Sequence, residues 1–176
     1  MNNIEISAKC REIAEKTGLT LEEYKNDGIT AAANCAALAE NLYGAGGNVS
    51  TMILINMGEE VSCGMIIEGK LFTGDIAHIT VNYNGKECTC GRKGCFNVYA
   101  SELEYLASGV IDILNLFQPN VLVLGGICES TLNAMNEIVE REKYARHSSE
   151  TTQIKLAELD YRDAVILGAA KLRCEK

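Results

Sequence analysis

Four residues that bind soft metal ions lie within eighteen positions of the sequence, and they are His78, Cys88, Cys90 and Cys95. One imidazole and three thiolates form a closed tetrahedral set, which is typical of a structural zinc site rather than a catalytic one. Gly91 and Gly94 allow the backbone to turn between these sulfurs. Free thiols and a disulfide are the alternatives, but cysteines separated by one residue suit a metal better. We therefore expect structural Zn²⁺ in a zinc loop of residues 78–95.

The composition predicts one cytoplasmic globular domain. The chain has 176 residues, of which 47% are hydrophobic and 23% charged, enough for a core of its own. No apolar run approaches the roughly 20 residues of a membrane span, and the first residues lack a signal-peptide core. We expect no membrane contact, and in a reducing compartment the other five cysteines should be small buried apolar residues: Cys10, Cys35, Cys63, Cys128 and Cys174.

The charge argues against nucleic acid as a partner of this chain. The formal net charge is −8, whereas phosphate binding needs a basic face. Residues 11–20 superficially resemble the start of a DNA-binding helix-turn-helix, but residues 21–27, which would form the recognition helix, carry more acidic than basic residues. An ordinary helical pair is the preferred interpretation.

The order of the expected elements predicts a layered α/β domain. A helical segment at residues 1–28 is followed by an α/β domain at residues 29–176 that contains the zinc loop. Apolar runs predict strands at residues 52–55, 63–67, 79–83, 121–124 and 154–159. Helical spacing predicts helices at residues 29–43, 98–117, 131–144 and 162–172. No linker or internal repeat divides this domain.

Residues 74–95 read G-D-I-A-H-x9-C-x-C-G-x-x-G-C, which resembles the zinc signature of the ROK family of repressors and sugar kinases. Four further stretches resemble family motifs in the right order, at residues 33–40, 64–71, 116–126 and 163–170. The resemblance extends from about Ala33 to Ala170. It implies a degenerate and shortened form of the second, C-terminal ROK domain, which is half of a ribonuclease-H-like, actin-like ATPase, with a mixed sheet and flanking helices.

The resemblance also implies which catalytic groups are changed. Ala32 stands where the family has its catalytic Asp, and alanine cannot accept a proton; Asp27 is a weaker candidate because it lies five residues too early. Where the family has a glycine-rich phosphate loop, Glu59 and Glu60 would repel phosphates. The nucleotide site retains only the pair Gly125 and Gly126, which a simple turn after a buried strand would also explain. No catalytic residue is predicted.

The sugar contacts of the family are partly retained. His78 matches a histidine that both holds zinc and faces the sugar, and Asp75 stands in place of a glutamate. Asn34 matches a family asparagine, whereas Asn97 replaces the glutamate expected after the last cysteine. The resemblance therefore implies Asn34, Asp75 and His78 as sugar-binding residues.

Two hypotheses about function follow from this pattern. The preferred one is a non-catalytic, zinc-containing ROK-like domain that acts in sugar sensing, regulation or assembly within a transcriptional-regulator or sugar-kinase type of protein. The alternative is an ATP-dependent hexose kinase whose first domain, expected to be absent here, is supplied elsewhere. In the family, the second domain normally buries one side against the first domain, and this side would otherwise be exposed here. Because family members also often form dimers through the second domain, we expect a homodimer.

Overall fold

The computed structural model of the protein describes residues 32–72, 74–142 and 152–174. The predicted helical segment at residues 1–28, Asp27 included, lies outside this part.

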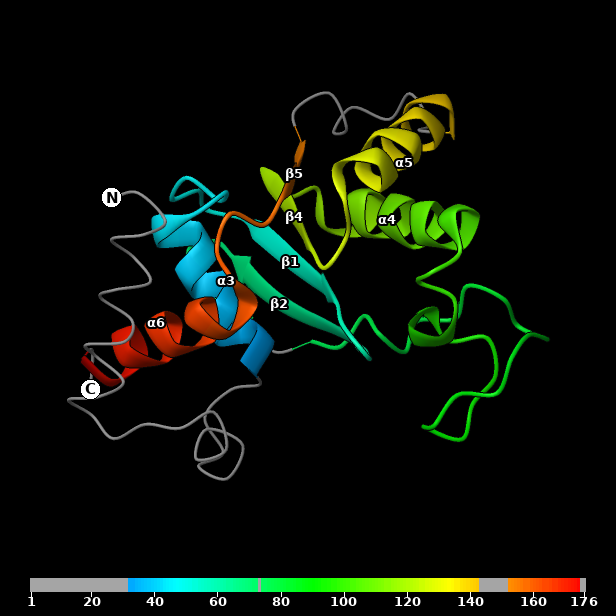
Figure 1. Ribbon diagram of the computed structural model, residues 1–176, viewed down its shortest axis with the longest axis horizontal. Coiled ribbons are helices and arrows are strands. Elements are labelled where there is room, and N and C mark those ends of the chain that lie inside the picture. Colours follow the sequence, from blue (N-terminus) through cyan, green and yellow to red (C-terminus); the bar gives the residue numbers. More distant parts are fainter. Residues whose placement is uncertain (1–31, 73, 143–151, 175–176) are drawn as a thin grey trace.

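A five-stranded sheet lies at the centre of the protein, with the strands in the order β3-β2-β1-β4-β5 (Figure 1). Their bounds are Met52–Met57 for β1, Val61–Ile67 for β2, Lys70–Phe72 for β3, Val121–Gly125 for β4 and Gln153–Leu156 for β5. Antiparallel pairing joins β1 to β2 and β2 to β3, whereas β4 runs parallel to β1 and β5 parallel to β4. The predicted mixed α/β sheet is confirmed.

Helices cover both faces of this sheet. Their bounds are Ala32–Tyr43 for α3, Leu103–Phe117 for α4, Glu129–Glu142 for α5 and Tyr161–Cys174 for α6. Figure 1 shows α3 beside α6 on one face and α4 beside α5 on the other. Alternate residues of β1 serve the two layers, because Met52 and Leu54 pack toward α3 and α6 while Ile53 and Ile55 pack toward α4 and α5. The continuous apolar run of β1 therefore reflects burial on both faces.

The contact between α3 and α6 depends on small residues. Alanines fill the buried face of α3, and a Cβ atom added to Gly168 of α6 would lie 1.8 Å from the carbonyl oxygen of Cys35. The two backbones therefore touch directly at this point.

Gly168→Ala should push α3 and α6 apart, and we expect a loss of about 1–3 kcal/mol in the free energy of unfolding, despite the better helix propensity of alanine. Urea denaturation would measure the loss. The exposed Arg162 of the same helix provides the control, because its change to alanine should alter stability by less than about 0.5 kcal/mol. Equal stability of Gly168→Ala and the wild type would contradict this packing.

Two predicted elements were wrong, and both lie at the zinc loop. Residues 79–83 form no strand, because the N–H groups of Val81 and Asn82 both bond to the carbonyl of Gly94 across the loop, and only the isolated bridge between Thr80 and Cys95 is ladder-like. The helix predicted from residue 98 begins at Leu103 instead. A 3₁₀ turn, η1, occupies Phe96–Val98, and the chain turns before α4 begins.

The other elements differ from prediction mainly at their ends. The last strand stops at Leu156 rather than at residue 159, because the N–H of Leu159 donates to the side chain of Glu40 instead of to a neighbouring strand. After β2 the chain turns at Gly69 into β3, a short strand outside the predicted ranges. Within the described part of the chain, every helix is too short or too polar to cross a membrane.

Candidate functional site

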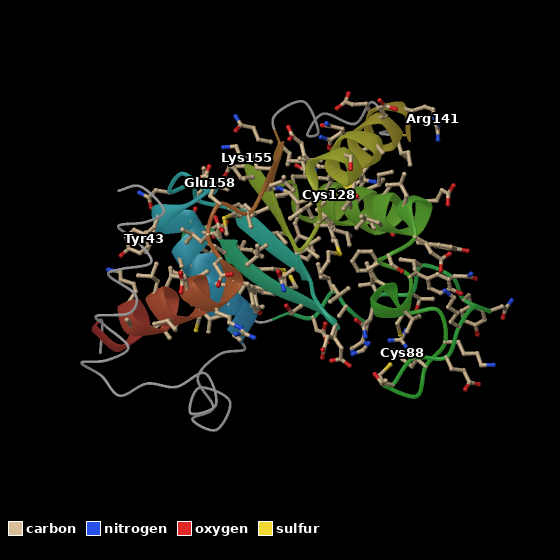
Figure 2. The ribbon with its side chains drawn as sticks, in the orientation of Figure 1. Tyr43, Cys88, Cys128, Arg141, Lys155 and Glu158 are labelled. Atoms are coloured by element: carbon tan, nitrogen blue, oxygen red, sulfur yellow. The ribbon has the colours of Figure 1, made fainter. Side chains whose placement is uncertain are left out.

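The zinc loop is closed at its base by main-chain hydrogen bonds. The N–H of Phe96 donates to the carbonyl of Ile79 and that of Asn97 to the carbonyl of Ala77, both at 2.8 Å. The Phe96 side chain is fully buried and packs so closely under α4 that a Cβ atom on Gly109 would lie 2.6 Å from its ring. The two ends of the loop are thus held together and anchored to the core, while Figure 2 shows Cys88 on the side of the molecule away from α3 and α6.

Two tight turns direct the cysteines inward. The N–H of Cys88 donates to the carbonyl of Arg92 at 2.8 Å, and the N–H of Gly91 donates to the carbonyl of Cys88 at 2.9 Å. Gly91 and Gly94 have φ angles of +84° and +72°, which favour glycine. A Cβ atom on Gly94 would also lie 1.6 Å from the carbonyl oxygen of Asn82. The predicted role of these glycines in turning the backbone is confirmed.

The four predicted ligands lie together in the structure. All of their ligand atoms are within 4.8 Å of one another. The sulfurs of Cys90 and Cys95 are 3.6 Å apart, and the sulfur of Cys88 is 3.6 Å from Nδ1 of His78. A disulfide would require about 2.05 Å. Ligand atoms about 2.1–2.3 Å from a tetrahedral zinc ion are separated from each other by about 3.5–3.8 Å, so the cluster fits Zn²⁺.

The thiols of this cluster differ in acidity. The backbone N–H of Cys90, directed at the sulfur of Cys88, lowers the pKa of Cys88 to about 6. Burial raises the pKa of Cys95 to about 11.

Asp75 lies beside His78. The other ring nitrogen of His78, Nε2, is 3.9 Å from Oδ2 of Asp75, while Oδ1 of Asp75 accepts the N–H of Ala77 at 2.9 Å. A carboxylate beside the distal nitrogen of a histidine ligand is a common way to orient the ring.

A group of polar and aromatic side chains that sequence reasoning missed connects the zinc loop to the start of α4. The rings of Tyr99 and Tyr105 are 4.3 Å apart, and Nδ2 of Asn82 donates to both hydroxyls, at 3.2 Å and 2.9 Å. The Tyr99 hydroxyl also accepts the N–H of Lys86 at 2.8 Å, and the Lys86 ammonium pairs with Glu102. Tyr99 therefore belongs to this junction and lies before α4, although the predicted helix at residues 98–117 included it.

The structure brings together two of the three predicted sugar-binding residues, Asp75 and His78. Asn34 lies in the first turn of α3, is only 4% exposed, and has an Oδ1 without a hydrogen-bond partner in the structure as described. No hydrogen bond among the described residues connects Asn34 to the other two. Ala32, which the resemblance aligns with the catalytic Asp of the family, is the first residue of α3.

Two cavities flank the turn between β1 and β2, residues 58–60, which we call the β1–β2 turn. The larger has a volume of about 680 Å³ and lies between this turn, η1 and the first turns of α4 and α5. The smaller, of about 430 Å³, lies toward α3 and α6. Glu59 and Glu60 are exposed on the turn, and Glu59 lines the larger cavity. The predicted phosphate-loop position is therefore an acidic rim.

Gly125 and Gly126 have a structural role between these cavities. Gly126 has a φ of +76°, and a Cβ atom on it would lie 2.0 Å from the carbonyl oxygen of Met57. A Cβ atom on Gly125 would lie 2.6 Å from Oδ1 of Asn56. The glycine pair lets the ends of β1 and β4 approach each other, which accounts for the pair without any nucleotide.

Cys128 corrects a prediction, because it is exposed rather than buried. It lines the larger cavity at the start of α5, where hydrogen bonds from the Ser130 and Thr131 hydroxyls lower its pKa to about 7.

Cys35 and Cys63 are buried as predicted, and burial raises their pKa values to about 11 and about 12. The side chains of Cys10 and Cys174 lie outside the described residues.

Comparison of the sequence with known proteins identifies the family of this chain. The sequence profile of the ROK family matches residues 16–104. A xylose repressor from Bacillus subtilis is 27% identical over an alignment of 161 residues, which covers 65% of this chain and 42% of the repressor. A glucokinase from Halalkalibacterium halodurans is 40% identical over 76 residues, or 39% of this chain and 23% of the glucokinase. This chain thus spans less than half of the length of either relative.

The overall structure agrees with these sequence matches. The crystal structure of a ROK family glucokinase from Streptomyces griseus, in complex with glucose and AMPPNP, superposes with a TM-score of 0.74 at 21% identity. The superposition covers 87% of this chain and 71% of the glucokinase. The chain therefore has the actin-like ROK fold, and its cluster of one histidine and three cysteines corresponds to the predicted zinc motif.

Proposed function

This chain belongs to the ROK family, and we propose that within it the chain forms a zinc-stabilised, non-catalytic domain that senses a sugar for a transcriptional regulator. The resemblance to xylose repressors supports the regulatory half of this proposal. In this reading the sugar changes the state of the domain by binding and is released unchanged.

The acidic β1–β2 turn is the observation that carries the proposal. Phosphoryl transfer depends on groups that neutralise the charge of the transferred phosphate. Here Glu59 and Glu60 are exposed on the turn, and Glu59 lines the larger cavity, where a kinase would present backbone N–H groups from glycines. Ala32 at the start of α3 also lacks any group that accepts a proton from a sugar hydroxyl.

We place the sugar beside the zinc loop, with Asp75, His78 and Asn34 as its polar contacts. Carboxylate, imidazole and amide groups suit the closely spaced hydroxyls of a sugar, because they accept and donate hydrogen bonds. Among the described residues, Oδ1 of Asn34 has no hydrogen-bond partner, and this supports the placement, since a buried amide oxygen without a partner costs free energy until a ligand supplies a donor.

Zinc at His78, Cys88, Cys90 and Cys95 would serve this site structurally. Three thiolates and one imidazole fill all four positions, so the ion supplies cross-linking and charge but no open position for chemistry. His78 would bind the ion through Nδ1, which faces Cys88, and leave Nε2 toward Asp75. We also propose that the domain acts as a homodimer in the cytoplasm, as expected from the family resemblance.

A sugar kinase remains the second candidate, because glucokinases are also among the relatives and one of them is 40% identical over 76 residues. In that reading, the second ROK domain would work with a first domain supplied by another polypeptide or segment. Glu59 and Glu60 are the residues that this candidate must explain.

The test is ADP formation by the zinc-loaded chain, with Mg-ATP and a panel of sugars that includes xylose, glucose and N-acetylglucosamine. We expect no sugar-dependent ADP above the background without sugar. Sugar-dependent ADP formation that disappears in Asp27→Asn would overturn the proposal and identify Asp27 as the base. The substitution Asp112→Asn, on the remote helix α4, is the matched control.

A further inference from the structure

Among the strands that the structure describes, none pairs with the first half of β2 on the side of β3. The partner strand β3 pairs with Met65, Ile66 and Ile67, so the first residues of β2 lie beyond the end of β3. Edge N–H groups need another partner or water. The ends of the zinc loop supply one, because the N–H of Val61, the first residue of β2, donates to Oδ1 of Asn97 at 2.7 Å.

Asn97 is also bonded to the metal-binding loop itself. It lies two residues after Cys95 in η1, and its own N–H donates to the carbonyl of Ala77, the residue before His78. A metal ion that joins His78 to Cys95 would therefore hold the two chain segments between which Asn97 is fixed. The Asn97 side chain then extends from this junction to the β1–β2 turn.

The same residues form one wall of the larger cavity. Asn97 lines the cavity together with Gly58, Glu59 and Val61. We propose that Asn97 is a positioning residue through which metal loading of the zinc loop fixes the β1–β2 turn and so sets the shape of the cavity of about 680 Å³. This inference rests on the zinc site of the proposed function. In this role, Oδ1 of Asn97 accepts a hydrogen bond from the backbone N–H of Val61.

The direct readout is the rate of hydrogen exchange at the Val61 amide, resolved by NMR. In the zinc-loaded wild type this amide should exchange slowly. Removal of the metal with a chelator should accelerate exchange at least about tenfold, in line with the loss of one hydrogen bond. The amide of Leu122, in the fully buried β4, is the internal control and should keep its protection.

Two substitutions separate the side-chain bond from general loosening. Asn97→Leu has a similar shape without an acceptor, and it should exchange as fast at Val61 as the metal-free wild type while it still binds one metal ion. Retention of the cysteine-to-metal charge-transfer absorption after Co²⁺ substitution would verify that the metal site is intact. Asn97→Asp preserves an acceptor oxygen and should restore slow exchange.

The possible failures are distinct. Unchanged Val61 exchange upon metal removal, measured on the wild type, would overturn the inference whatever the variants do, and so would slow exchange in a folded, metal-loaded Asn97→Leu. A chain that binds no zinc would overturn both the zinc site and this inference. Sugar-dependent ADP formation would overturn the sensing function and leave the Asn97 contact standing.

Discussion

Cys90→Ser should release the bound metal and lower the free energy of unfolding on the order of 3–5 kcal/mol, because metal binding in a closed site contributes directly to folding. Cys90 is the exposed member of the cluster, with its sulfur 3.6 Å from that of the fully buried Cys95. Without the ion, the two remaining thiols, of Cys88 and Cys95, and the His78 ring would lose the ligand that joins them. We expect a lower melting temperature together with a loss of one zinc per chain, measured by calorimetry and by atomic absorption.

Cys128→Ser provides the control for this experiment. Cys128 is also exposed, but it lies at the start of α5 and hydrogen-bonds to Ser130 and Thr131 rather than to the cluster. Its replacement should leave the zinc content unchanged and alter stability by less than about 0.5 kcal/mol. If Cys90→Ser melted at the wild-type temperature with zinc still bound, the proposed ligand set would be wrong.

Glu40→Ala should destabilise the protein by about 3–5 kcal/mol, through a mechanism unrelated to the metal. The Glu40 side chain is fully buried, and its two carboxylate oxygens accept the N–H groups of Ala45 and Leu159, both at 2.8 Å. It thereby connects the end of α3 to the loop that precedes α6. Alanine would leave both N–H groups without an acceptor and create a cavity beside Gly44 and Leu159. Urea denaturation would measure the loss.

Glu104→Ala, at an exposed position of α4, controls for the removal of a glutamate from a helix and should be nearly neutral. A loss in Glu40→Ala no larger than that of this control would mean that the two hydrogen bonds are absent in solution.

Glu40 should also make stability depend on pH. Burial raises the pKa of this carboxyl above its ordinary value of 4.5, and the N–H groups of Leu159 and Ala45 only partly oppose this. Between pH 4.5 and the raised pKa of the folded protein, the folded protein binds more protons than the unfolded chain. The stabilising contribution of Glu40 is therefore complete below about pH 4.5 and declines as the pH rises through the raised pKa. The stability difference between wild type and Glu40→Gln should therefore fall with rising pH in this window. A difference that grows with pH would show the opposite shift.

The parts of the site that sequence reasoning predicted are those that depend on near neighbours. The ligand set of the zinc loop follows from ligand types, short spacing and two glycines, and the structure brings His78 and the cysteines together accordingly. The buried strands β1 and β4 were likewise visible as continuous apolar runs. In each case, the physical signal lies within a few residues of the feature that it predicts.

The features that were missed depend on contacts between distant segments. Asn97 bonds to Val61, 36 positions away, and Glu40 to Leu159, 119 positions away, so neither partner could be chosen before the fold was known. The segment at residues 79–83 has the alternation of a strand, but the tight pairing of the zinc loop with Gly94 determines its conformation instead. Cys128 was predicted to be buried from its residue type alone, although its place at the mouth of a cavity determines its exposure.

The central claim is that this domain binds a sugar without phosphorylating it, and thermal denaturation of the zinc-loaded chain tests it most directly. Xylose, glucose and N-acetylglucosamine would each be added with and without Mg-ATP, to the wild type and to Asp75→Ala. We predict that at least one sugar raises the melting temperature without nucleotide, that Mg-ATP adds nothing, and that Asp75→Ala abolishes the increase. An increase that requires Mg-ATP, or no increase with any sugar, would contradict the account.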